Sequence, residues 1–546
     1  MYKIINRLNK YSKFIPLFIY LTTLYLSREI CLLMFNVIDS PDFNKYFEYI
    51  RYFFYQTEQT NLSQGNFYYM LQSWGLYFFS HSANKDNLAM IFNNSIQIVN
   101  FFLYIIAQIG LYNLLRFFQI KRNSILLTLS LLNFFPLMIA LRITMKSEIL
   151  VLAFLPWIIL LIEIFLKTKK SIYLFTVLPM LTIVLLSKGL ALGAISIFLF
   201  LTYIKKMIFI NKKLLIFLTI VFISLSFLLF IEDSNINKQN LLEPTHADKY
   251  DNLAPVSIIY KIEIKDFVNT PFKHNQSNSF IGITLLDTFG DYFDLYWNND
   301  SSNFFKNRKQ LIVYESDNSK ILPTFSSQDK TFTVYGSKSD PSYANSGDYL
   351  RDTLSWILTF VFYLLILKIF LEKNEIRKFL IGPFIGMSLL LITSITGFPV
   401  KNYDINISDT LKPFYYSYFV ILSFAFMYAY FLKKNSFTKL IFVPLFFSFL
   451  FILGFPKANN EEFENKVSLI NSYSAFCEVN NIYFKIMDYE VTDCSSSPKI
   501  RNIQLIINEN YLSSKPRLAY TNLFIGLTTI LSFVYYFYDR KKILNE

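Results

Sequence analysis

Long apolar runs separated by short basic loops are the feature that most constrains this chain. Several runs approach or exceed the roughly 20 apolar residues that cross a bilayer as a helix. The composition agrees, because 53% of the residues are hydrophobic and the mean hydropathy is +0.35, whereas soluble domains are less apolar. We therefore expect an all-α polytopic membrane protein, not a soluble enzyme with a membrane anchor.

The net charge of +13 has an explanation that does not involve nucleic acid. The lysines and arginines of the chain gather in the short loops between apolar runs, which is the pattern of cytoplasmic loops in membrane proteins. Lys3, Arg7, Lys10 and Lys13 precede the first run and place the N-terminus in the cytoplasm. No small-residue cleavage site follows that run, so we interpret it as a retained helix.

About 12 transmembrane helices are expected, with both termini cytoplasmic. The expected spans are 14–38, 88–118, 124–141, 149–166, a fifth ending near 187, a sixth ending near 205, 214–231, 353–371, 379–396, 413–432, 440–455 and 518–538. The apolar segment 67–79 is too short to span and fits an interfacial or re-entrant helix.

The same pattern divides the chain into five parts. An N-terminal transmembrane module, 1–231, contains seven helices and an outer loop at 39–87. A larger extracytoplasmic insertion follows at 232–351, since so long a polar segment exceeds a simple connector. Helices 8 to 11 occupy 352–455, a smaller C-terminal extracytoplasmic segment occupies 456–517, and the last helix and a cytoplasmic tail occupy 518–546.

Cysteine and histidine are scarce. Cys477 and Cys494 share the outer segment 456–517, where an oxidising compartment would allow a disulfide between them. The alternative is two free thiols too far apart to bond. No Cys/His metal-binding spacing is present, which disfavours zinc catalysis.

Two carboxylates, Asp39 and Asp42, follow the first apolar run, and Tyr46 follows them. A carboxylate just outside a bilayer can deprotonate an acceptor hydroxyl, or hold a divalent metal such as Mg²⁺ or Mn²⁺ against a phosphate. The alternative is a polar turn that caps a helix.

Charged residues stand at two other predicted outer helix ends: Arg142, Lys146 and Glu148 before the helix at 149–166, and Lys188 after the fifth helix. At this depth they would bind the phosphate of a lipid-borne donor and stabilise the leaving group. The alternatives are an interfacial salt bridge for Lys146 and Glu148 and ordinary interface anchoring for Lys188.

Two further clusters could bind an acceptor or sugar. Aromatic residues interleaved with acidic ones suit stacking on a sugar ring, or divalent-cation binding through oxygen. The members in the large insertion are Asp287, Asp291, Asp294 and Trp297. Lys412 and Tyr415 could line the same cavity from the second half of the chain. A solvated turn and an aromatic belt are the respective alternatives.

These motifs resemble the GT-C superfamily of lipid-phosphate-sugar-dependent glycosyltransferases, including the protein O-mannosyltransferase-like and aminoarabinose-transferase-like branches. Asp39 and Asp42 with Phe43 and Tyr46 are similar to the family's acidic first outer loop, and Lys146-Ser147-Glu148 is similar to the turn that opens its fourth helix. The resemblance covers roughly residues 1–230. Many members have a tighter acidic pair, whereas Ser-Pro separates the two aspartates here; we favour Asp42 as the base, with Asp39 assisting or binding metal.

The resemblance implies a hexosyl or pentosyl transferase of the bacterial inner membrane that faces the periplasm or outside. Its donor would be a polyprenyl-phosphate sugar, and its acceptor a glycolipid, polysaccharide or protein. An O-antigen polymerase or ligase is the nearest alternative enzyme, and a transporter or flippase of lipid-linked glycans is the alternative outside enzymes. No Walker motif is present, which disfavours a nucleotide-driven pump.

Overall fold

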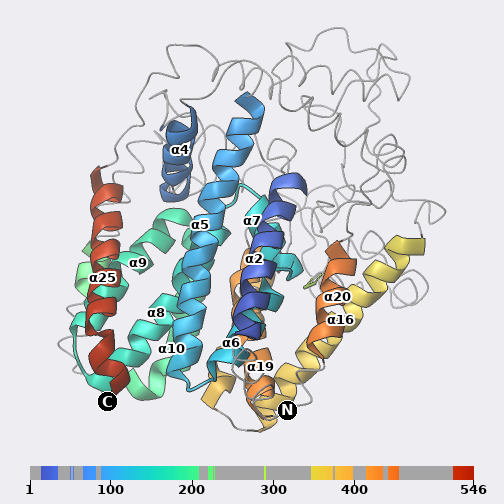
Figure 1. Cartoon of the computed structure of the whole chain (residues 1–546). Helices are drawn as coiled ribbons and strands as arrows, with labels where there is room; N and C mark the ends of the chain where they lie inside the picture. The colour runs from blue at the N-terminus through green and yellow to red at the C-terminus, as the bar shows by residue number, and fades with distance from the viewer. Residues whose placement is uncertain are drawn as a thin grey trace, which may run out of the picture.

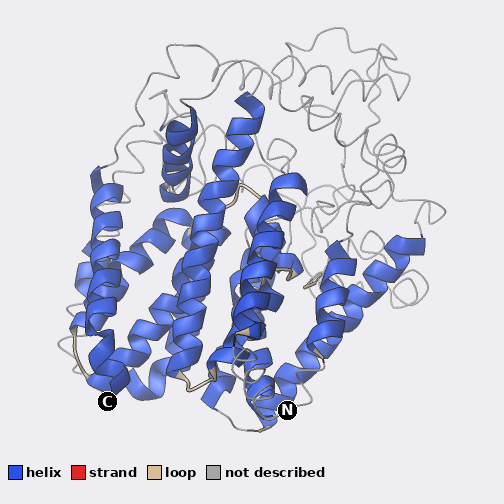
Figure 2. Ribbon diagram, viewed as in Figure 1, coloured by secondary structure: helices blue, strands red, loops and turns tan. Residues whose placement is uncertain are grey.

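The computed structural model describes thirteen stretches or single positions of the chain. These are residues 14–34, 50, 53, 66–80, 88–207, 219–224, 227, 288–289, 346–372, 375–396, 413–434, 441–453 and 520–545. All regular secondary structure in them is helical (Figure 2). The expected all-α class is therefore confirmed for this part of the chain.

The described helices fall where the apolar runs predicted them (Figure 1). They are α2 (Ile15–Met34), α4 (Phe67–Ser80), α5 (Leu88–Phe117), α6 (Arg122–Leu132), α7 (Pro136–Ile143), α8 (Glu148–Thr168), α9 (Ile172–Ser187), α10 (Gly189–Met207), α16 (Ser346–Leu371), α17 (Gly382–Thr396), α19 (Ser417–Lys434), α20 (Phe442–Leu453) and α25 (Tyr520–Asn545), with 3₁₀ turns η5 (Glu375–Phe379) and η6 (Pro413–Tyr416).

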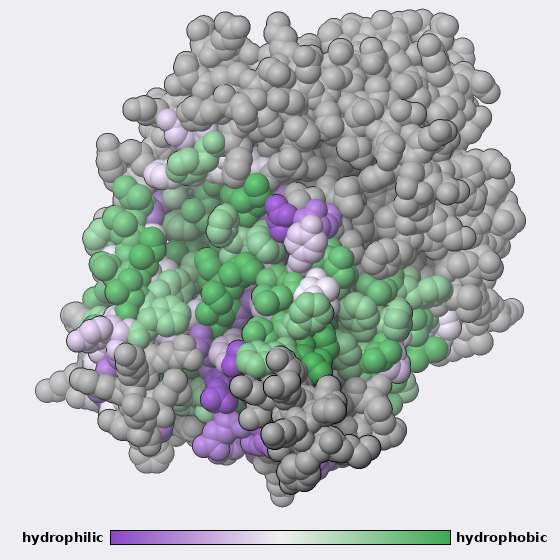
Figure 3. All heavy atoms as spheres, viewed as in Figure 1, coloured by the Kyte–Doolittle hydropathy of each residue, from purple (hydrophilic) through white to green (hydrophobic). Residues whose placement is uncertain are grey.

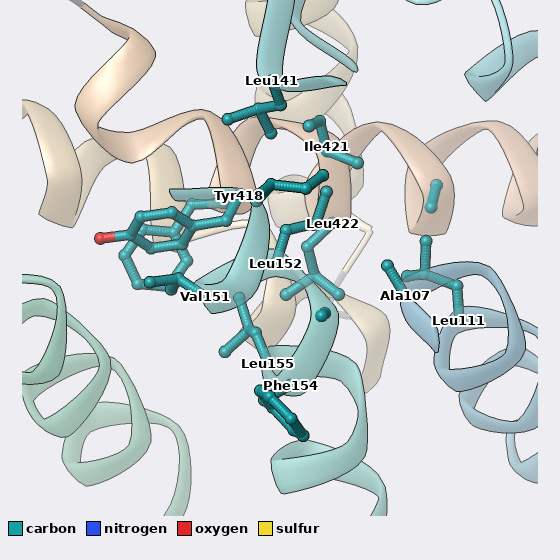
Figure 4. Close-up of a cluster of buried hydrophobic side chains, with 14 of the residues drawn as sticks. Ala107, Leu111, Leu141, Val151, Leu152, Phe154, Leu155, Tyr418, Ile421 and Leu422 are labelled. Atoms are coloured by element: carbon teal, nitrogen blue, oxygen red, sulfur yellow. The ribbon is translucent and has the colours of Figure 1, made fainter. Parts of the chain in front are cut away.

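Helix α8 is the centre of the bundle. It has no polar face along most of its length, and a helix that is apolar all round must be covered on every side. Its most apolar stretch is 94% buried, and it packs most extensively against α5 and α9. Figure 4 shows the core that it forms, where Leu111 of α5, Leu141 of α7, Leu152 of α8 and Leu422 of α19 meet.

The peripheral helices have the opposite property, because they expose apolar surface. The stretch of α16 with mean hydropathy 2.3 is only 28% buried, and Phe360, Leu364 and Leu367 are among its exposed side chains. Figure 3 shows a broad hydrophobic band across the visible face, with hydrophilic residues at its upper and lower edges. Exposed apolar area on this scale marks a surface that does not face water, which supports membrane insertion.

Three described helices are long and apolar enough to cross a membrane, or four if α6 and α7 together form one broken span. The full expectation of about 12 spans includes segments outside the described residues, and it stays a prediction.

The single helix expected at 124–141 is instead two helices, α6 and α7, which meet at 61°. The cause is Pro136, which opens α7 and leaves Phe135 extended at ψ 124°. Proline has no N–H to continue the helix, and it disfavours helical backbone in the preceding residue. The break also lets α7 continue through Arg142 and Ile143, which were expected in a loop.

Other boundaries shift by smaller amounts. Helix α16 begins at Ser346, so the large insertion, expected to run to 351, ends earlier. Helix α4 has 14 residues, or roughly 21 Å, which is too short to cross a bilayer. Its Tyr68, Gln72 and Ser73 are fully buried, and it packs on α5.

The bundle has two ends, which we name after residues of α8. The Glu148 end contains the start of α8, the α9–α10 turn and η6. The Glu163 end contains the α5–α6 and α8–α9 turns, η5 and the end of α25. Most of the described loop lysines and arginines belong to the Glu163 end, which is the side expected in the cytoplasm. The orientation of the bundle in a membrane stays a prediction.

Candidate functional site

Four of the predicted site residues come together at the Glu148 end. The ammonium group of Lys188 forms an ion pair with Oε1 of Glu148. The same ammonium lies 4.3 Å from the ring centroid of Tyr415, and the ammonium of Lys146 lies 5.9 Å from it. Residues from the first and second halves of the chain thus meet at one place.

The local backbone explains why these side chains converge. Glu148 opens α8, where a carboxylate is favoured by the positive end of the helix dipole. Lys188 is the single residue between α9 and α10, and its extended backbone (φ −160°, ψ 103°) turns the chain back. Tyr415 lies in η6, the 3₁₀ turn that leads into α19. Three element ends therefore supply the cluster.

The charged side chains of the cluster are largely buried. Glu148 is 1% exposed and Lys146 is 2% exposed, and the side chain of Lys188 is 13% exposed. Charge interactions strengthen in such a setting because the effective dielectric constant is low. The charges of the cluster therefore interact strongly with one another.

Two hydroxyl groups next to these residues in sequence are buried without a hydrogen-bond partner among the described residues. They belong to Ser147, the N-cap of α8, and Ser417, the first residue of α19. Buried polar atoms are normally satisfied by protein or water. A polar ligand or water at this end of the bundle would supply the missing partner.

Arg142 points its guanidinium into a different part of the bundle. It donates a hydrogen bond to Ser27 of α2 at 2.9 Å and lies 4.6 Å from the ring centroid of Tyr104 and 5.5 Å from that of Phe101 in α5. Its Nε has no hydrogen-bond partner in the described part of the chain. These contacts tie α7 to α2 and α5; the expectation that Arg142 binds a donor phosphate stays a prediction.

Asn100 of α5 supports the backbone that leads to Lys146, and the sequence analysis gave it no role. Its Oδ1 accepts hydrogen bonds from Tyr68 and Gln72 of α4. Its Nδ2 donates to the carbonyls of Arg142 and Thr144. All four hydrogen bonds are buried, so Asn100 holds the turn before Lys146 in place. Asn100 is one of several amides in the long apolar run of α5. Such groups must be satisfied internally, but the sequence does not single out this one.

A second buried ion pair lies at the Glu163 end. Oε1 of Glu163 in α8 accepts from the ammonium of Lys378 in η5, and from the hydroxyl of Tyr203 in α10 at 2.9 Å. The Lys378 ammonium also lies 4.8 Å from the ring centroid of Phe379. The spacing of Glu163, Tyr203 and Lys378 in the sequence did not predict this contact, because the three residues lie far apart along the chain.

An exposed ion pair at the Glu163 end, between Glu372 and Lys434, lowers the pKa of the Glu372 carboxyl. Hydrogen bonds from Tyr430 and Lys434 hold the pKa of the Glu372 carboxyl below its usual range. Lys434 donates at 2.9 Å and Tyr430 at 2.7 Å. This pair joins the end of α16 to the end of α19, outside the apolar segments.

Ten predicted site residues lie outside the described residues. They are Asp39, Asp42, Tyr46, Asp287, Asp291, Asp294, Trp297, Lys412, Cys477 and Cys494. In the described part of the chain, no group of three or more His, Cys, Asp or Glu side chains is placed to hold a metal ion.

Comparison with protein-family models, with curated proteins and with solved structures gives no significant match.

Proposed function

We propose that the chain is a membrane glycosyltransferase that moves a sugar from a polyprenyl-phosphate donor to an extracytoplasmic acceptor. The observation that supports this most directly is the convergence of Lys146, Lys188 and Tyr415 at the Glu148 end. Two buried ammonium groups beside an aromatic face suit a phosphate that carries a sugar. The resemblance of the first outer loop to GT-C enzymes supplies the catalytic carboxylates Asp42 and Asp39.

The proposed reaction breaks one bond and forms one. Asp42 accepts the proton of the acceptor hydroxyl, and the acceptor oxygen bonds to the anomeric carbon of the donor sugar. The bond between that carbon and the phosphate oxygen breaks, and the electron pair leaves with the phosphate. The products are the glycosylated acceptor, polyprenyl phosphate and a protonated Asp42. Lys146 and Lys188 would stabilise the negative charge that develops on the leaving phosphate.

Sugar transfer by the purified full chain in lipid tests the proposal. A panel of polyprenyl-phosphate sugars would be incubated with candidate glycolipid, polysaccharide and peptide acceptors, and sugar release measured for wild type, Asp42→Asn and Lys188→Met. We expect turnover by the wild type, a loss of at least about 100-fold in Asp42→Asn, and a comparable loss in Lys188→Met.

Lys434→Met is the matched control. It removes a lysine from an ion pair at the opposite end of the bundle, so it should keep wild-type turnover. Unchanged turnover in Asp42→Asn would move the base to Asp39 or elsewhere. Absence of turnover with every donor, from protein that unfolds cooperatively, would contradict the proposal and favour a polymerase or transporter.

A further inference from the structure

We infer that Glu148 discriminates between lipid phosphates by charge: its carboxylate weakens the binding of a dianionic phosphate more than that of a monoanionic one. This inference rests on the proposed function and extends it. The proposed function says that a phosphate binds near Lys188; the inference says that the carboxylate of Glu148 weakens the binding of the more highly charged form of that phosphate.

The geometry places a fixed negative charge where the ligand charge must go. The carboxylate of Glu148 contacts the ammonium of Lys188, and that ammonium lies over the ring of Tyr415. Any anion attracted to Lys188 therefore shares this cation with Glu148. Glu148 is 1% exposed in the first turn of the central helix α8, so its carboxylate is held beside Lys188 and away from solvent.

Among the residues that the structure describes, charged and titratable groups near Glu148 come from three elements. Lys188 contacts it from the α9–α10 turn, and Tyr418 of α19 interacts with it electrostatically. Figure 4 shows the Tyr418 hydroxyl pointing out of the hydrophobic cluster. Lys146 lies two residues before Glu148 and faces the same Tyr415 ring. Replacing Glu148 by Gln removes one negative charge from this set and changes no other member.

Sugar transfer changes the charge of the lipid. A polyprenyl-phosphate sugar is a phosphodiester with one negative charge, whereas the released monoester has a second pKa near 6 and carries close to two charges at pH 8. Repulsion by a fixed carboxylate is proportional to the ligand charge, so it is twice as large for the product. Even in bulk water, two unit charges 4 Å apart interact enough to change affinity about fivefold.

The consequence is a site that holds its product less tightly than its two lysines alone would, while the donor is affected about half as much. Glu148 would assist the release of polyprenyl phosphate after each transfer, and it would also disfavour pyrophosphate-linked lipids, which carry an additional charge. The carboxylate thus acts as a specificity-determining residue, while Lys188 supplies the attraction.

Binding measurements on the full chain in nanodiscs test the inference without any acceptor. Dissociation constants would be measured for polyprenyl phosphate and for a polyprenyl-phosphate sugar, at pH 8 and pH 5, with wild type and Glu148→Gln. We expect Glu148→Gln to lower the ratio of the monoester constant to the diester constant at least about fivefold at pH 8. At pH 5 both lipids carry one charge, so the ratio should differ little between the two proteins.

Glu163→Gln provides the matched control, because Glu163 is a second buried, lysine-paired glutamate of the same helix at its other end. It should leave the ratio at the wild-type value. A ratio of two constants from one preparation does not depend on the folded fraction. If Glu148→Gln does not fold, Lys188→Met is compared with the double variant Glu148→Gln and Lys188→Met, which leaves no unpaired member of this ion pair. The double variant should have the lower ratio at pH 8, and equal ratios would overturn the inference.

The outcomes separate the two proposals. An unchanged ratio in Glu148→Gln, or the same change in Glu163→Gln, would overturn the inference while sugar turnover kept the proposed function. Wild-type protein that binds neither lipid would overturn both. Binding with the expected ratio shift but no turnover with any acceptor would support the charge discrimination and count against glycosyl transfer.

Discussion

Glu148 and Glu163 stand about 22 Å apart along helix α8, and each forms an ion pair with a lysine from another part of the chain. The helix between them is apolar and almost completely buried. One pair is surrounded by predicted site residues and the other is not. The two pairs therefore allow functional and structural effects of a buried charge to be measured on a single helix.

Lys378→Met should destabilise the fold by roughly 3 kcal/mol, because removing one partner leaves a buried charge uncompensated. Glu163 would keep only its hydrogen bond from Tyr203. The double variant Glu163→Leu with Lys378→Met should recover most of the loss, since it leaves no unpaired charge. Unfolding midpoints in detergent measure both effects. A double variant no more stable than the single one would show that the pair does not act as a unit.

Tyr415→Leu should weaken the binding of polyprenyl phosphate by about tenfold, whereas Tyr415→Phe should retain most of the affinity. The ammonium of Lys188 lies 4.3 Å from the ring centroid, and a cation–π interaction of a desolvated ammonium contributes up to about 2 kcal/mol. Phe keeps the ring face and Leu removes it. Titration of each variant with the lipid measures the effect, and equal affinities for the Leu and Phe variants would exclude a role for the ring.

Asn100→Ala should lower the free energy of unfolding by about 3 kcal/mol or more, because it leaves several buried polar groups unpaired. Asn100 joins α4 to the turn before α8 through four hydrogen bonds. Asn113→Ala is the comparison, since its Nδ2 makes one hydrogen bond, to the Ile109 carbonyl in its own helix. Chemical unfolding of both variants checks the difference. Similar losses would mean that Asn100 is no more than an ordinary buried amide.

The apolar runs predicted the helices well because run length alone decides whether a segment can form a long buried helix. The break between α6 and α7 was not predicted, although Pro136 was visible, because a proline within an apolar run can also be accommodated. Pro156 shows this, since α8 continues through it. Whether a proline breaks a helix depends on its neighbours in space.

For the candidate site, too, the sequence indicated the residues but not their contacts. Lys146, Glu148 and Lys188 were expected to bind the donor phosphate, because each lies at an expected outer helix end. Tyr415 was expected to bind the acceptor or sugar from the second half of the chain. Their pairing was not predictable, since Lys188 and Glu148 are 40 residues apart and only packing brings them into contact. The direction of Arg142 toward Ser27 was missed for the same reason.

The ion pair of Glu372 should make the stability of the fold depend on pH in the acidic range. Because the folded pKa of Glu372 lies below its usual value of 4.5, its contribution is present above about that pH and is lost as the pH falls through the folded pKa. The difference in unfolding temperature between wild type and Glu372→Gln should thus be positive at pH 7 and disappear on acidification. Glu375→Gln is the control, since no ion pair of Glu375 is found in the described residues. A difference that persists at the lowest pH would assign the effect to something other than charge.

Gly110→Ala should destabilise the bundle by about 2 kcal/mol through overpacking. A Cβ on Gly110 of α5 would lie 2.8 Å from Nε1 of Trp157 and 3.1 Å from Cβ of Pro156, both in α8. The indole cannot yield easily, because its N–H donates to the carbonyl of Ile106 at 3.0 Å. Gly193→Ala in α10 is the control: its Cβ would meet nothing within 4 Å, and alanine favours a helix by up to about 1 kcal/mol over glycine. The two substitutions should therefore shift the unfolding midpoint in opposite directions, and a shared direction would show that α5 and α8 do not pack this closely.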